Sequence, residues 1–278
     1  MALCISFEDY VAQYGTITLD HDSGGTGSST AVSGYTVASL KTRQLGDVFR
    51  FDRDGTGYTI IRVDFSTSFT EPLCIGVCGF TNVDTPSYTN PLTLRLYNTT
   101  TLLATSSYTD QTSEFVQTVV ANMFASVVGC NRLEIWVSGT TDTIDIGRIW
   151  CGPAFQSRHS TGMSWDTGPV DTGSVSLSRS GAAYPRVGVV SREVTLPIPR
   201  LEGAEIFGTS YTGDIGDKST VPLEYGVHSV GKTSEFLAFQ ENALNPMRPV
   251  YGHFIELPRF TSIGGNNYET VLNMREER

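Results

Sequence analysis

Residues 143–155, TIDIGRIWCGPAF, begin with a strand pattern and end at the Gly152-Pro153 step. Ile144 and Ile146 are two residues apart and therefore share one face of an extended strand. The chain before this segment consists of short, Thr-rich alternating stretches, whereas the chain after it is richer in Pro, Gly and Arg and alternates less cleanly. We interpret the segment as the boundary between two halves. Ile144 and Ile146 are expected to complete a core, and Gly152-Pro153 to turn the chain out of it.

Period-two alternation recurs through the first half of the chain. In LTLRLYN (92–98) and RLEIWV (132–137), every second residue is Leu, Ile or Val. Such alternation buries one strand face and leaves the other wet, which is typical of antiparallel sheets. Further strands are expected at 48–51, 58–65, 73–80, 102–108, 114–120 and 143–150. The sequence therefore predicts a mainly β protein with an N-terminal antiparallel β-sandwich, of the jelly-roll or carbohydrate-binding-module-like kind.

One turn in this half carries a specific signal. Asp54-Gly55, followed by Gly57, separates the apolar runs 48–51 and 58–65. Glycine accepts positive φ without steric cost, so an Asp-Gly step between two such runs favours a β-hairpin. We expect the two runs to pair with each other.

The second half has a different pattern. Residues 157–185 are polar, and a long irregular segment of this kind is usually functional or packed against a neighbour. An extended strand is expected over 186–196, stopped by Pro197 and Pro199, with short helices at 201–207 and 233–239. The predicted organisation is an N-terminal arm and Gly/Ser-rich loop at 1–40, a β-sandwich at 41–156, and a smaller α+β assembly domain with a long polar connector at 157–278.

Composition limits the partners. The 278 residues carry a formal net charge of −10, and the Lys and Arg residues are scattered, which argues against binding to a nucleic-acid backbone. The N-terminus lacks the pattern of a secretion signal, and no run of about 18 apolar residues occurs. We expect no membrane span and synthesis in the cytoplasm.

The five cysteines are sparse and mostly have apolar neighbours, which favours reduced, buried thiols. An alternative is a four-thiolate site for zinc or an iron–sulfur cluster, formed by Cys74, Cys78, Cys130 and Cys151. The Cys74-x3-Cys78 spacing differs from the C-x2-C step of most metal knuckles, so the prediction is no cofactor.

No catalytic constellation can be assigned. The four histidines are far apart along the chain, and none has a His or carboxylate partner at the spacing that a helix would bring together. We therefore predict that the protein is not an enzyme. Trp136, Trp150 and Trp165 could stack on sugars, although a Trp on an alternating strand is more often a core or interface residue.

The segments IGRIWCGPAF (146–155), GMSWDTG (162–168), LSRSGAAYP (177–185) and VSREVTLPIPRL (190–201) resemble virion structural proteins of tailed bacteriophages, as does PVYGHFIELPRF (249–260). The resemblance covers roughly residues 140–278. The residues that carry it are Gly147, Arg148, Trp150, Gly152, Pro153, Trp165, Ser178, Arg179, Ser180, Gly181 and Tyr184. Cys151 departs from the pattern, because a small or polar residue is expected beside Gly-Pro.

The resemblance implies a structural subunit of a tail, tail tip or baseplate, which is assembled in the host cytoplasm and located in the virion. Its partners would be other tail proteins and further copies of itself in a ring. Gly147, Arg148, Trp150, Gly152, Pro153, Trp165, Arg179 and Tyr184 would then lie at a junction or interface. One alternative is a receptor- or glycan-binding tail protein that recognises a host surface glycan, and another is a cell-wall hydrolase.

Overall fold

The computed structural model describes most of the chain. The described residues are 2–21, 27–42, 44–55, 57–83, 92–108, 118–125, 127–138, 142–158, 165–171, 173–177, 183–186, 188, 190–208, 221–241 and 249–277. Within these ranges every strand pairing is antiparallel. The protein is therefore mainly antiparallel β, as the sequence predicts.

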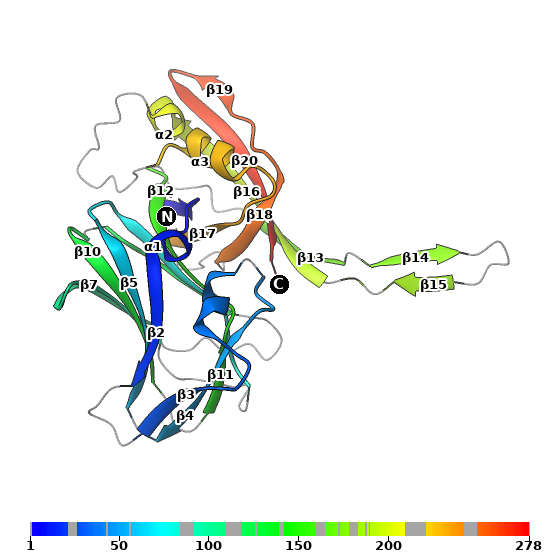
Figure 1. Cartoon of the computed structure of the whole chain (residues 1–278). Coiled ribbons are helices and arrows are strands. Elements are labelled where there is room, and N and C mark those ends of the chain that lie inside the picture. Colours follow the sequence, from blue (N-terminus) through cyan, green and yellow to red (C-terminus); the bar gives the residue numbers. More distant parts are fainter. Residues whose placement is uncertain are drawn as a thin grey trace.

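Two sheets form the body of the molecule (Figure 1). The smaller sheet has the order β2-β5-β10-β7-β8 and comprises β2 (Gly15–His21), β5 (Tyr58–Phe69), β7 (Leu92–Asn98), β8 (Thr101–Tyr108) and β10 (Cys130–Ser138). The larger sheet comprises β1 (Ala2–Ser6), β3 (Gly27–Ala31), β4 (Phe49–Gly55), β6 (Leu73–Asn82), β9 (Thr118–Phe124), β11 (Asp142–Ile146), β12 (Arg148–Gln156), β13 (Asp166–Asp171), β16 (Val190–Glu202), β17 (Phe236–Glu241), β18 (Val250–Glu256), β19 (Thr261–Gly264) and β20 (Asn267–Glu276).

The sandwich core lies between the smaller sheet and one end of the larger sheet. Alternate residues of β7 and β10, such as Leu94 and Ile135, are fully buried, while their neighbours face outward. Ile144 and Ile146 of β11 join the same core, as the strand pattern predicts. Burial of these aliphatic side chains stabilises the layer packing by about 1.5–3 kcal/mol for each side chain.

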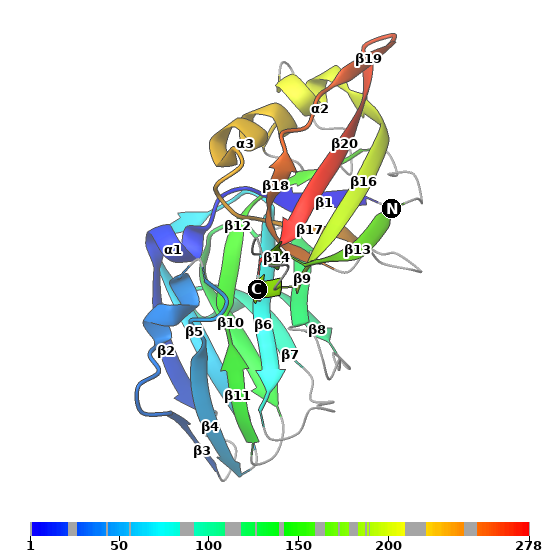
Figure 2. The same cartoon turned by 90° about the vertical axis from the view of Figure 1, so that its right-hand side faces the viewer.

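The other end of the larger sheet forms a second core with two short helices, α2 (Gly203–Phe207) and α3 (Leu223–Val230) (Figure 2). Apolar residues of β16 and β20, including Leu196 and Leu272, face Leu223 and Val227 of α3 in one buried cluster. Strands β1 and β12 lie between the two ends, so the larger sheet runs through both halves of the molecule.

The segment 143–155 does not turn out at Gly152-Pro153. It breaks at Gly147, between β11 and β12, and β12 continues through Gly152 and Pro153 with every residue buried. Pro153 lies where both neighbouring ladders end, since β1 pairs only as far as Ala154 and β6 begins at Leu73. A proline there removes no ladder hydrogen bond, which is why the strand tolerates it.

Residues 1–40 do not form a separate N-terminal arm. β1 pairs with β12 and β17 in the larger sheet, and β2 is an edge strand of the smaller sheet. The helix α1 (Tyr10–Tyr14) joins them, and the short 3₁₀-helix η1 (Val37–Lys41) follows β3. Part of the expected Gly/Ser-rich loop is itself strand β3, which pairs with β4.

The expected hairpin at Asp54-Gly55 is also wrong. β4 pairs with β3 and β11 in the larger sheet, whereas β5 pairs with β2 and β10 in the smaller one. The connection therefore crosses from one layer to the other. Gly57 has φ of 108°, a value that glycine adopts without strain, so the turn residue is real although the hairpin is not.

Two further predictions in the second half need correction. β16 continues through Pro197 and Pro199 because β13 pairs with it only as far as Thr195, which leaves an edge where proline is tolerated. The helix expected at 233–239 is mostly strand β17, and the helix in this region is α3. The helix expected at 201–207 is confirmed over Gly203–Phe207.

A two-stranded hairpin projects from the body. It consists of β14 (Ser174–Leu177) and β15 (Ala183–Arg186), which pair with each other as a separate sheet. Figure 1 shows this hairpin extending away from β13, on the side opposite the smaller sheet. We call β14 and β15, with the residues between them, the arm. It occupies part of the polar connector expected from the sequence.

Candidate functional site

The outward face of the smaller sheet carries a cluster of aromatic and charged side chains from three neighbouring strands. We call Tyr58, Arg62, Arg95, Glu134 and Trp136 the outer-face cluster. Glu134 on β10 lies opposite Arg62 on β5 and opposite Arg95 on β7 in the two ladders. Register alone therefore brings the carboxylate between two guanidinium groups.

Trp136 is the centre of this cluster. The guanidinium carbon of Arg95 lies 3.7 Å from the centroid of its ring, and the Tyr58 ring is 5.2 Å away at an angle of 59°. The indole Nε1 donates a 2.9 Å hydrogen bond to Glu134 Oε2. These contacts hold the half-buried indole in one orientation before any ligand arrives.

Ion pairs extend the cluster across the sheet. Arg62 Nε donates to Glu134 Oε1 at 3.2 Å, and Arg62 Nη2 lies 3.4 Å from Asp20 Oδ2 on β2. One carboxylate thus holds both Arg62 and Trp136, which makes Glu134 the organising residue of the face. It is 5% exposed, because the two longer side chains cover it.

The arrangement suits recognition of a polar ring. Aromatic faces stack on the apolar faces of flat ligands, and charged groups at fixed positions exchange hydrogen bonds with hydroxyl groups. Sequence reasoning placed Glu134 and Trp136 on one strand face but did not bring in Tyr58, Arg62 or Arg95. Their outward positions follow from alternation, whereas their meeting depends on the register of β5, β10 and β7.

Arg148 forms a second, buried constellation between the halves. Its Nη2 donates to Asp9 Oδ2 at 2.6 Å and its Nη1 to Tyr251 Oη at 2.6 Å and to the carbonyl oxygen of Thr42 at 3.1 Å. Burial raises the pKa of Tyr251 well above its usual value, so the phenol stays neutral and accepts the bond from Arg148. The guanidinium therefore joins three segments that are far apart in sequence.

Other residues singled out by the sequence lie near this constellation. The Trp150 ring packs edge-on against Tyr251 with centroids 5.9 Å apart, and its Nε1 donates to Ser6 Oγ at 2.9 Å. A side chain at Gly152 would meet the carbonyl oxygen of Glu8, since the built Cβ lies 1.8 Å from it. Gly147 is similarly close to Leu45.

The remaining predicted interface residues are distributed elsewhere. Trp165 packs against the second core, at the start of β13. Tyr184 belongs to β15 of the arm, and Arg179 lies outside the described residues. The structure thus brings Gly147, Arg148, Trp150, Gly152 and Pro153 together along β12, and places Trp165 and Tyr184 apart from them.

The larger sheet separates the four thiols of the alternative metal site. Cys74 and Cys78 lie on the face of β6 that packs against Trp150 and Tyr251, whereas Cys130 and Cys151 belong to the sandwich core. All five cysteines are buried, and burial raises the pKa of the Cys130 thiol to about 11. The described residues contain no group of three or more metal-ligating side chains, and in this arrangement the four thiols do not converge on one point.

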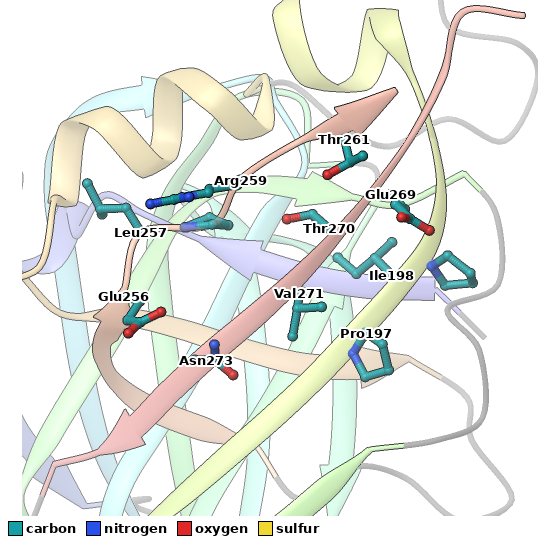
Figure 3. Close-up of a pocket in the computed structure, with 12 residues that line it drawn as sticks. Pro197, Ile198, Glu256, Leu257, Arg259, Thr261, Glu269, Thr270, Val271 and Asn273 are labelled. Carbon is teal, nitrogen blue, oxygen red and sulfur yellow. The ribbon is translucent and has the colours of Figure 1, made fainter. Parts of the chain in front are cut away.

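A groove lies on the second half, on the face of β16 and β20 opposite the helices (Figure 3). β18 leaves β20 after Glu256, and β19 rejoins it at Thr261, so the segment 257–260 stands apart from the sheet. The groove has a volume of about 470 Å³. Its lining comprises Pro197, Ile198, Pro199, Glu256, Leu257, Pro258, Arg259, Thr261, Glu269, Thr270, Val271 and Asn273.

Within the part of the chain that the structure describes, no helix has the length and hydropathy to cross a membrane.

Comparison with known proteins finds similarity to solved structures only at a distance. No protein-family model and no curated protein matches the chain. A mutant of the lectin-binding domain of lectinolysin complexed with Lewis b is 6% identical, with a TM-score of 0.39 over 52% of this chain and 96% of that one. A fucose-binding module of Streptococcus pneumoniae is 11% identical, with a TM-score of 0.38 over 49% of this chain and 89% of that one.

A phage protein is also among the similar structures. The enzymatically active domain of bacteriophage CBA120 tailspike protein 4 is 15% identical, with a TM-score of 0.34 over 51% of this chain and 19% of that chain. At these identities and TM-scores the similarities do not assign a function to this chain.

Proposed function

We propose that this chain is a glycan-binding protein and that the outer-face cluster is its binding surface. The observation that carries the proposal is the fixed indole of Trp136, held by Arg95 on its face, Tyr58 at its side and Glu134 at its nitrogen. A binding role without catalysis requires only such a preorganised surface.

The chemistry of the cluster matches a saccharide better than other ligand classes. The rings of Tyr58 and Trp136 offer apolar area to the C–H groups of a pyranose. Glu134 and Arg62 offer an acceptor and a donor for its hydroxyl groups. Both signs of charge are present side by side, which favours a neutral or weakly charged polyhydroxylated ligand over a strongly ionic one.

The surface is open, so a single site is expected to bind weakly. A sheet face buries less of a ligand than a cleft does, and a dissociation constant of about 0.1–1 mM corresponds to roughly −4 to −5.5 kcal/mol. Several copies on one assembly would raise the overall affinity without a new contact.

A glycan array tests this proposal. The full chain, displayed on a multivalent carrier, is expected to bind at least one class of oligosaccharide, and Trp136→Ala on the same carrier is expected to lose that signal. Arg132→Ala is a matched control, because Arg132 is also outward on β10 and pairs with Asp64 away from the indole. A blank array for the unaltered chain, or equal signals from Trp136→Ala, would sink the proposal.

A second candidate function is a structural subunit of a phage tail, as the sequence resemblance implies. The projecting arm favours it, because a single two-stranded hairpin is at best marginally stable in water and gains stability from a partner. The expected result is an oligomer in solution and the presence of the chain in purified virions by mass spectrometry. A monomer that is absent from virions would contradict this candidate and leave glycan binding untouched.

A further inference from the structure

The arm differs in charge from the rest of the chain. Residues 174–190, SVSLSRSGAAYPRVGVV, contain Arg179 and Arg186 and no Asp or Glu, whereas the whole chain carries a net charge of −10. A positively charged projection on an acidic protein is attracted to an acidic surface. The body of a second copy supplies such a surface.

The groove on β16 and β20 has matching properties. Its floor includes the exposed side chain of Val271 together with Pro197, and Leu257 faces them from the segment after β18 (Figure 3). Two exposed carboxylates, Glu256 and Glu269, lie in its lining. Apolar area bordered by carboxylates suits an extended segment that carries guanidinium groups.

One buried polar atom in the groove also lacks a partner. Thr270 is 4% exposed and lines the groove, and its Oγ1 makes no hydrogen bond to any residue in the described ranges. A buried hydroxyl without a partner costs about 1–3 kcal/mol. A backbone group of an occupant could satisfy it.

The arm cannot reach the groove of its own chain. β16 begins at Val190, beside the root of the arm, and reaches the groove at Pro197, seven residues further on. At about 3.3 Å per residue the two are separated by roughly 23 Å. The arm extends from Val190 away from that end of β16, as Figure 1 shows.

We propose that the arm of one copy of this chain occupies the β16–β20 groove of a second copy, with an arm guanidinium against Glu256 or Glu269. The contact joins two different surfaces, so it repeats from copy to copy and closes into a ring if the rotation allows. This inference rests on the assembly role given above as the second candidate, and it names the partner and the surface.

Light scattering after size exclusion, with complementary variants, tests the proposal. The unaltered chain is expected to be oligomeric. A variant with residues 173–188 replaced by a short Gly-Ser linker is expected to be monomeric, as is Glu256→Lys/Glu269→Lys. These two variants, when mixed, are expected to form a one-to-one dimer, because the first keeps the groove and the second keeps the arm. Asp47→Lys, an exposed acidic residue elsewhere, is the control and is expected to stay oligomeric.

The outcomes separate the two levels of inference. A monomeric unaltered chain at about 100 µM overturns the assembly role together with this contact. An oligomer that is insensitive to Glu256→Lys/Glu269→Lys, or variants that fail to combine, overturns the groove as the docking site and leaves assembly intact. Urea midpoints equal to that of the unaltered chain establish that the exposed substitutions do not unfold it.

Discussion

Arg148 Nη1 lies 2.6 Å from the phenol oxygen of Tyr251, a residue 103 positions later in the chain. The same guanidinium holds Asp9 at 2.6 Å, and both members of that ion pair are almost fully buried. One side chain therefore connects the first strand region, the segment after η1 and the second half.

Replacement of Arg148 by Ala is expected to lower the free energy of unfolding by about 3–5 kcal/mol, because it leaves the Asp9 carboxylate buried without its partner. Urea denaturation followed by tryptophan fluorescence measures this. Arg132→Ala is the matched control, since its 2.6 Å pair with Asp64 is partly exposed and such pairs contribute about 0–1 kcal/mol. Equal losses from the two variants would show that Arg148 does not connect the halves.

Gly152→Ala is expected to destabilise the protein by about 1–3 kcal/mol or more, because a Cβ at this position would lie 1.8 Å from the carbonyl oxygen of Glu8. Gly168→Ala on the edge strand β13 has no heavy atom within 4 Å of the built Cβ and is expected to change stability by less than about 0.5 kcal/mol. Thermal unfolding of both variants measures the difference. A neutral Gly152→Ala would contradict the close approach of the N-terminal segment to β12.

All five thiols are expected to be unreactive in the native state. Cys4, Cys74, Cys78, Cys130 and Cys151 each have 0% exposed area. A thiol-specific chromogenic reagent is expected to modify none of them within minutes at pH 8 and all five after urea is added. Rapid labelling of any cysteine before denaturation would show that its cover opens.

Stability is also expected to fall as pH rises between about 9 and about 11. Burial raises the pKa of the Cys130 thiol from 9.0 to about 11. Both folded and unfolded states keep the proton below pH 9, whereas above it the unfolded state ionises first and is favoured until the folded thiol also ionises. Because other groups titrate in this range, the measurement is the difference in pH dependence between the unaltered chain and Cys130→Ala. Identical slopes would contradict the raised pKa.

Local patterns predict most strands of this fold but few of their pairings. Alternation in 92–98 and 132–137 identifies β7 and β10, because the period of two is visible within each segment. The partners of β4 and β5 depend on strands far away in the chain, so the local Asp-Gly signal gives the wrong hairpin. Likewise, Gly152-Pro153 indicates a break from composition, whereas the ladders around β12 accommodate both residues.

The outer-face cluster is predictable only in part for the same reason. Alternation puts Glu134 and Trp136 on the wet face of β10. The contact between Trp136 and Arg95 requires the antiparallel register in which Glu134 faces Arg95 across β7 and β10. That register results from the packing of several strands and leaves no signal at either position alone.

The most direct test of the proposed function is the affinity of Trp136→Ala for an oligosaccharide that the unaltered chain binds, measured by isothermal titration calorimetry. Loss of the aromatic stack is expected to weaken binding about tenfold, which corresponds to about 1.4 kcal/mol, while Arg132→Ala binds as the unaltered chain does. Equal affinities of Trp136→Ala and the unaltered chain, or no binding by the unaltered chain to any glycan offered, would contradict the outer-face cluster as a glycan site.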